Sequence, residues 1–193
     1  MSSSHQKGCE CSAHPNSTAQ TLSELEFERG IWNAAIENDT PKLIKLLNNG
    51  NDPNQKDNSG YTALHYAARA GNNDVLKILL SHGADPNSLT SAGGATPLHR
   101  AGYMGNLGGI GILIKHKARV DISDSDGKTV LHKCAEKGHY DCAKFILDNS
   151  GEFKTKILDM KDKKGNSAYV YAKLFQEKEK TNCEKLCDLL SLY

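Results

Sequence analysis

Three histidines, His65, His99 and His132, recur at intervals of 34 and 33 residues, each three positions after a threonine. Imidazole rings are common metal ligands and general bases, so three of them could bind zinc or serve catalysis. The constant interval argues against both uses, because equivalent positions in stacked repeats lie about 10 Å apart. Such rings are too far apart to share one metal ion. We therefore expect them to form structural hydrogen bonds.

A second group with possible chemistry lies near the start of the chain, where Cys9, Cys11 and His14 stand close together. Zinc usually takes four ligands, and this segment offers three, with an uncommon Cys-x-Cys spacing. These residues are weak metal candidates, to which His5 or a partner could add a fourth ligand. The alternative, which we favour, is a disordered tail over residues 1–20, because the segment has no hydrophobic periodicity.

Cys134 and Cys142 could supply a thiol nucleophile, since His139 lies close to Cys142 in the sequence. A Cys–His catalyst needs an oriented pair in a cleft. In the repeat register, however, Cys134 aligns with Ala67 and Cys142 with Val75, so both thiols are predicted to be small buried hydrophobes. A metal- or thiol-dependent enzyme is therefore a weak alternative. We expect no catalytic residue and no cofactor.

The repeated unit defines the elements that carry these residues. A threonine begins each inner helix, where its hydroxyl can cap a free backbone amide, and Pro97 suits the first helical position. Gly71 and its equivalents end this helix at a position suited to a left-handed cap. An outer helix follows, as in residues 74–80, whose apolar residues recur at helical spacing. No repeat can bury its apolar faces alone, so stacking must supply the core.

The unit resembles the ankyrin repeat. Residues 60–71 read Gly-Tyr-Thr-Ala-Leu-His-Tyr-Ala-Ala-Arg-Ala-Gly, and Gly-Ala-Asp-Pro-Asn follows at 83–87. Related copies begin at Gly94 and Gly127, with a degenerate copy upstream and a fragment at 165–172. The resemblance implies an all-α helical solenoid with β-hairpin fingers. The expected units are a disordered tail (1–20), a capping helix with degenerate repeat 1 (21–56), repeat 2 (57–89), repeat 3 (90–123), repeat 4 (124–160) and a divergent C-terminal capping repeat (161–193).

The outer helix of repeat 3 departs from the pattern, because Gly108, Gly109 and Gly111 fall within it. Each glycine costs a helix about 1 kcal/mol relative to alanine. Lys117 also replaces the glycine that ends the outer helix of repeat 2. We therefore expect the array to be locally least stable at repeat 3.

The resemblance also indicates a binding surface, since in this family the residue after the motif histidine and the residue three positions later face the concave side, and finger residues flank them. A central patch of tyrosine and arginine has the composition of an interaction hot spot. We predict a non-catalytic scaffold or adaptor that binds another protein there. The predicted binding residues are Tyr61, Tyr66, Arg69, Arg100, Tyr103, Lys128, Lys133 and Glu136.

Asn54 and Asn87 support a different, regulatory hypothesis. Each ends an Asp-Pro-Asn turn eight residues after a leucine, and they resemble the asparagines that an asparaginyl hydroxylase modifies in other ankyrin repeats. In that case the chain would be a hydroxylase substrate. The structural alternative is that both are turn residues, a role in which asparagine is favoured.

Bulk properties exclude several other classes of partner. The net charge is +1, so no overall field attracts nucleic acid. The sequence has no apolar stretch near 18 residues and no apolar signal region, so we expect neither a membrane span nor secretion. Its six cysteines are then expected to be reduced, which favours the cytosol or the nucleus. We expect a monomer.

Overall fold

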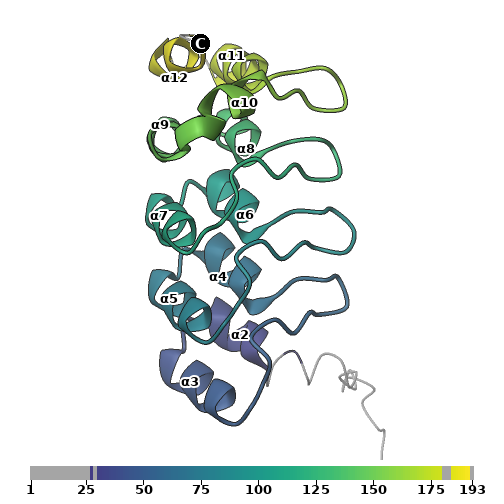
Figure 1. Ribbon diagram of the computed structural model, residues 1–193, viewed down its shortest axis with the longest axis vertical. Helices are drawn as coiled ribbons and strands as arrows, with labels where there is room; N and C mark the ends of the chain where they lie inside the picture. The colour runs from purple at the N-terminus through teal and green to yellow at the C-terminus, as the bar shows by residue number, and fades with distance from the viewer. Residues whose placement is uncertain (1–26, 28–29, 180–183, 192–193) are drawn as a thin grey trace, which may run out of the picture.

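The computed structural model describes residues 27, 30–179 and 184–191 of the 193-residue chain. Antiparallel helix pairs stack along one axis in two layers, and loops project from one side of the stack as fingers (Figure 1). The inner helices, next to the fingers, are α2 (Ile31–Ile36), α4 (Ala63–Ala70), α6 (Pro97–Met104), α8 (Val130–Glu136) and α11 (Ala168–Glu179). The outer helices are α3 (Thr40–Asn48), α5 (Asn73–Ser81), α7 (Leu107–Lys115), α9 (Tyr140–Asn149) and α12 (Glu184–Ser191). A 3₁₀ turn (Gly151–Phe153) and helix α10 (Lys154–Asp159) join α9 to the last finger.

The predicted all-α solenoid is confirmed, but the fingers are not β-hairpins with formed strands. Within the described residues, pairing is limited to one isolated bridge, between Lys161 and Ser167. Each finger is closed by hydrogen bonds between its two arms, such as that from the Asp57 amide to the Tyr61 carbonyl, at 2.9 Å. The following threonine already begins a helix, so the arms are too short to extend a ladder.

The fingers also bond to one another through their tips. The amides of Ser91, Ser125 and Lys163 each donate to a carbonyl of the preceding finger, at 2.9 to 3.3 Å. Gly60 makes this approach possible: it has a φ of +79°, and a Cβ there would lie 2.3 Å from the Ser91 amide nitrogen. The fingers therefore form a column held by backbone groups.

Helices α4, α6 and α8 begin as the repeated motif predicts, and α4 and α6 also end as predicted, whereas α8 has Lys137 as its C-cap and the left-handed Gly138 follows it. Thr62, Thr96 and Thr129 are their N-cap residues, and the histidine three positions later completes a capping box with each. Pro97 occupies the first turn of α6. Gly71 and Gly105 are left-handed C-caps of α4 and α6.

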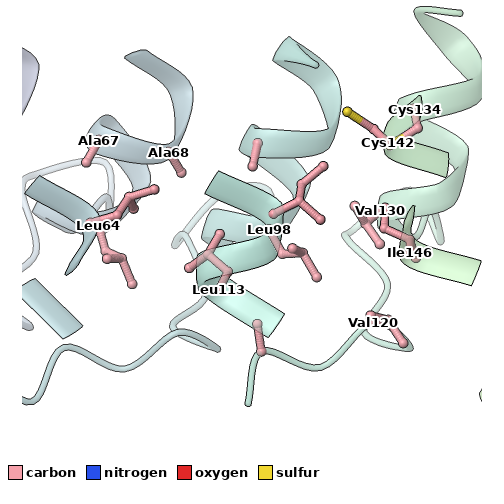
Figure 2. Packing of buried hydrophobic residues seen from close by; sticks show 14 of the residues in the cluster. Leu64, Ala67, Ala68, Leu98, Leu113, Val120, Val130, Cys134, Cys142 and Ile146 are labelled. Atoms are coloured by element: carbon pink, nitrogen blue, oxygen red, sulfur yellow. The ribbon is translucent and has the colours of Figure 1, made fainter. Parts of the chain in front are cut away.

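The core is continuous along the stack and lies between the two helical layers. Inner helices contribute Leu64, Leu98 and Leu131, and outer helices contribute residues such as Leu113 and Ile146, all fully buried. Cys134 and Cys142 lie in this core (Figure 2). Burial raises the pKa of the Cys134 thiol well above its usual range and that of Cys142 to about 11. Their predicted role as buried hydrophobes is confirmed, since thiols of such high pKa are poor nucleophiles.

Repeat 3 uses glycine for close packing. A Cβ on Gly102, in α6, would lie 2.7 Å from Val130 Cγ2 of α8. In α7, a Cβ on Gly109 would lie 2.3 Å from the Asn106 side chain, which caps this helix through a 2.8 Å hydrogen bond. Helix α7 spans nine residues, as α5 does. The low stability expected of repeat 3 stays a prediction.

Both ends of the stack are closed by apolar residues. At the start, Trp32 takes the histidine position and donates a hydrogen bond to the Gln55 carbonyl, at 3.1 Å. At the far end, Leu186 and Leu190 of α12 are buried against the last repeat, as the helical spacing predicts. The predicted disordered tail, the Cys9, Cys11 and His14 cluster, and Cys183 lie outside the described residues.

Candidate protein-binding surface

The inner helices and fingers present three rows of side chains, with one residue from each repeat. The finger row lies four positions before the motif histidine, the first-turn row one position after it, and the last-turn row four positions after it. The finger row is Tyr61, Ala95, Lys128 and Asn166. The first-turn row is Asn33, Tyr66, Arg100, Lys133 and Tyr171, and the last-turn row is Ile36, Arg69, Tyr103, Glu136 and Leu174.

An aromatic cluster joins the first two rows at repeats 2 and 3. The rings of Tyr61 and Tyr66 lie 5.5 Å apart, and Phe27 contacts Tyr66 edge to face at 5.6 Å. The guanidinium of Arg100 lies over the Tyr61 ring, with Cζ 4.9 Å from the centroid, and donates a hydrogen bond to the Tyr61 hydroxyl. This contact is a cation–π arrangement, and together with the hydrogen bond it keeps the guanidinium beside the finger.

Finger aspartates fix most of the first-turn row. Asp57, Asp124 and Asp162 each accept two or more backbone amides of their own finger. Their second oxygen accepts from the first-turn side chain: the Tyr66 hydroxyl at 2.6 Å, the Lys133 ammonium at 2.7 Å and the Tyr171 hydroxyl at 2.6 Å. Burial by itself would raise the pKa of Asp124, but the hydrogen bonds from Lys133 and from the finger amides, together with the charge of Lys133, outweigh it and lower that pKa.

Repeat 4 carries two lysines on this surface, and both are paired. Lys128 forms an ion pair with Glu136 at 3.0 Å and lies 4.4 Å from the centroid of the Tyr171 ring. Lys133 and Asp124 are almost buried, with 17% and 6% of their side chains exposed. The positive charges of these two lysines are therefore compensated within the protein.

The last-turn row is the most exposed and alternates between apolar and charged residues. Ile36, Tyr103 and Leu174 are 36%, 37% and 52% exposed, although all three are large hydrophobic side chains. Lys137 lies over the Tyr103 ring, at 4.6 Å from its centroid. A hollow of about 210 Å³ lies between α8 and α11, lined in part by Glu136 and Leu174. These side chains are accessible to a partner.

The motif histidines form structural hydrogen bonds, as predicted. In His99, Nδ1 accepts from the Thr96 amide at 3.1 Å, so the ring hydrogen is on Nε2, which donates to the Lys128 carbonyl of the next finger at 2.9 Å. His65 and His132 repeat this arrangement, toward the Ala95 and Asn166 carbonyls. Burial lowers the pKa of His65 and of His99 to about 4, and it also lowers that of His132. These rings are neutral links between repeats, with no free nitrogen for a metal or a substrate.

Asn54 and Asn87 link successive outer loops. The side chain of Asn54 donates to the Gly83 carbonyl at 3.0 Å and accepts from the Asp85 amide at 2.7 Å. Asn87 makes the same pair of contacts with the Lys117 carbonyl and the Arg119 amide, at 3.3 and 2.8 Å. The turn role is therefore confirmed, and hydroxylation of either residue stays a prediction.

The described residues contain no group of three or more histidine, cysteine, aspartate or glutamate side chains that could hold a metal ion. Within the same residues, no helix has the length and apolar character needed to cross a bilayer.

The three rows contain nine residues in repeats 2 to 4, and all of them except Ala95 were predicted to bind a partner. The contacts described above bring most of these eight residues together. Sequence reasoning missed Tyr171, which extends the first-turn row into the last repeat. It also missed the finger aspartates. The spacing contains both signals: Tyr171 follows Gly165 by six residues, as Tyr66 follows Gly60, and an aspartate precedes each of these glycines by three.

Comparison with known proteins places the chain among repeat proteins. A family model described as ankyrin repeats (3 copies) matches residues 31–124, 96–157 and 110–189. Human Ankyrin repeat domain-containing protein 39 is 45% identical over 83 residues, which cover 42% of this chain and 45% of that protein. Human Cyclin-dependent kinase 4 inhibitor B is 31% identical over 125 residues, 65% of this chain and 90% of that protein. Mouse RelA-associated inhibitor is 33% identical over 121 residues, 61% of this chain and 15% of that protein. The chain thus matches less than half the length of the first of these relatives.

Proposed function

Because the chain belongs to the ankyrin repeat family, we propose that it is a non-catalytic scaffold or adaptor that binds a partner protein across its finger and inner-helix rows. A solenoid offers an extended surface of this kind without a built-in reaction centre. The binding residues proposed are those of the three rows, centred on repeats 2 and 3.

The exposure of the last-turn row is the observation that carries this proposal. Scattered apolar residues are normal on a protein surface. Here, however, Ile36, Tyr103 and Leu174 recur at one helical position in three repeats, and Met104 beside Tyr103 is 50% exposed. Large apolar side chains held at regular intervals on rigid helices suit a partner that lies along the stack.

The column of finger tips gives a second reason. Each tip is bonded to the preceding one through its backbone, so the fingers are ordered before a partner arrives. A partner then loses less free energy to the ordering of loops, which favours affinity.

The names of two relatives fit the same reading. One is called an inhibitor of cyclin-dependent kinase 4 and another a RelA-associated inhibitor, and both names describe action on another protein. For this chain we take from them only the general class, which is binding of a partner protein.

The proposal is tested by capturing proteins from cells with the wild type and with a double variant that carries Tyr103→Ala and Arg69→Ala. Both side chains are exposed, so their removal should leave the fold intact. Lys77→Ala and Lys144→Ala on the outer helices are the control. If the inner-helix variant still captured the partner proteins and the outer-helix variant did not, the binding surface would lie elsewhere on the protein.

We also propose that the protein is a monomer in the cytosol or the nucleus and that it does not bind nucleic acid. Light scattering of the purified chain tests whether it is a monomer, and imaging of a tagged chain tests where in the cell it is located. If the chain shifted a random-sequence DNA duplex in electrophoresis, the proposal that it does not bind nucleic acid would be wrong.

A further inference from the structure

Repeat 3 lacks a carboxylate that the other fingers provide. Asp57, Asp124 and Asp162 each bind the first-turn side chain of their own repeat. The equivalent residue in the finger of repeat 3 is Thr90, whose amide donates to the Ala95 carbonyl and whose hydroxyl accepts from the Ala95 amide, both at 3.0 Å. Thr90 therefore closes its finger as the aspartates close theirs, but its side chain carries no negative charge.

The first-turn residue of repeat 3, Arg100, is consequently a cation without a counter-ion. Its guanidinium has no ion pair among the described residues, and its one hydrogen bond there goes to the Tyr61 hydroxyl. Its Nε is buried without any hydrogen-bond partner. Asp57 does not compensate for this, because its two oxygens accept from Tyr66 and from finger amides.

An arginine in this state is costly for the isolated protein, because a guanidinium cannot lose its proton and a buried donor without a partner destabilises the fold. The neighbouring repeat avoids the cost: Lys128 and Lys133 each have a carboxylate partner. Arg69, the last-turn residue of repeat 2, is also exposed and has no ion pair within the part of the chain described. Among the residues of the three rows, the positive charges without an ion pair are therefore Arg69 and Arg100, in repeats 2 and 3.

We propose that Arg100 receives an aspartate or glutamate side chain from the bound partner, which supplies the carboxylate that Thr90 lacks. This inference rests on the proposed function and specifies the chemistry of its partner. Tyr61 holds the guanidinium in place through its ring and its hydroxyl, and a planar guanidinium matches a carboxylate in geometry. Tyr103 and Met104 lie exposed at the end of the same helix. The partner segment is thus acidic, with an apolar residue nearby.

The test uses a random peptide library displayed on yeast and sorted against the full chain. The wild type should enrich peptides that contain Asp or Glu. Arg100→Gln should weaken binding of the enriched peptides by about tenfold, which is about 1.4 kcal/mol, and should no longer select acidic residues. Thr90→Asp should have the same effect although it retains the arginine, because the new carboxylate pairs with Arg100 inside the protein. Lys144→Gln on α9 removes one positive charge from the opposite layer and should leave selection unchanged.

The two proposals fail in different ways. If enriched peptides need Tyr103 but show no excess of acidic residues, or if Thr90→Asp keeps the acidic preference, the pairing at Arg100 is wrong and the binding surface stands. If no peptide is enriched, or if enriched peptides bind equally well to Tyr103→Ala, the binding surface is wrong as well. Melting temperatures show whether each variant is folded. A folding failure of Thr90→Asp would have a different cause from one of Arg100→Gln, so either variant that folds still tests the proposal.

Discussion

Replacement of His99 by glutamine should change how the stability of the protein depends on pH. His99 is buried and neutral, with its pKa lowered to about 4 by burial, whereas in the unfolded chain the pKa returns to 6.5. A group with a lowered folded-state pKa contributes stability above its unfolded pKa. That stability is lost as the pH falls from 6.5 toward 4, because the unfolded state takes up the proton first. Glutamine has no such proton to bind.

The magnitude follows from the two pKa values. Each pH unit between them is worth about 1.4 kcal/mol, so His99 should account for a loss of about 2 kcal/mol between pH 8 and pH 5. The variant begins less stable by about 1 kcal/mol, because it loses the hydrogen bond from Nε2 to the Lys128 carbonyl. The difference in unfolding free energy between the two proteins should therefore shrink, or change sign, as the pH falls.

Urea unfolding at several pH values from 8 to 5 measures this difference. Circular dichroism follows the whole array and fluorescence of the single tryptophan, Trp32, follows its first repeat, so agreement of the two signals tests for one cooperative transition. The same change from histidine to glutamine at the exposed His82 is the matched control. A gap between wild type and His99→Gln that stays constant from pH 8 to pH 5 would refute the assignment of a neutral, buried ring.

Four further predictions concern packing and modification. Gly111→Ala should raise the free energy of unfolding by about 1 kcal/mol, since a Cβ there meets other atoms only at ordinary contact distance; an unchanged or lower value in urea unfolding would count against it. Gly102→Ala should lower the same quantity by about 1–3 kcal/mol, because its Cβ would crowd Val130; a neutral result would mean that α6 and α8 can move apart. Asn87→Ala should lower the free energy of unfolding by about 1 kcal/mol, because it removes two solvent-exposed hydrogen bonds to the next loop, and equal midpoints would contradict this. If Asn54 or Asn87 is hydroxylated, the intact mass of protein from oxygenated cells should exceed that from hypoxic cells by an oxygen atom, and identical masses would remove the hydroxylase hypothesis.

Much of the fold could be predicted because the repeated motif encodes local structure. The threonine cap, the histidine at the third helical position and the glycine after the helix act within one turn of chain, so their spacing alone locates the inner helices. The burial of Cys134 and Cys142 followed from alignment with alanine and valine in other repeats. These inferences succeeded because equivalent positions of a stacked array have equivalent surroundings.

The finer features depend on contacts between residues far apart in the sequence. The Arg100 guanidinium meets Tyr61, 39 residues earlier, and no local pattern indicates that approach. The extra residue in the finger of repeat 3 hides the correspondence of Thr90 to the finger aspartates. Gly102 stands where repeat 2 has Ala68, and the closeness of α8 in the structure explains the glycine. At Gly108, likewise, a Cβ would lie 2.5 Å from the side chain of Asn73 in α5, a contact that the sequence does not indicate.

In the proposed function, the column of finger tips separates the side chains that would contact a partner from the backbone that presents them. The hydrogen bonds of this column join backbone amides and carbonyls. Every residue type except proline has both groups, so these bonds do not depend on which side chain each finger carries. The finger row already holds tyrosine, alanine, lysine and asparagine on equivalent backbones. Under this proposal, the residues of the finger row can be replaced one at a time, which would change the preferred partner, while the backbone that presents them keeps its structure.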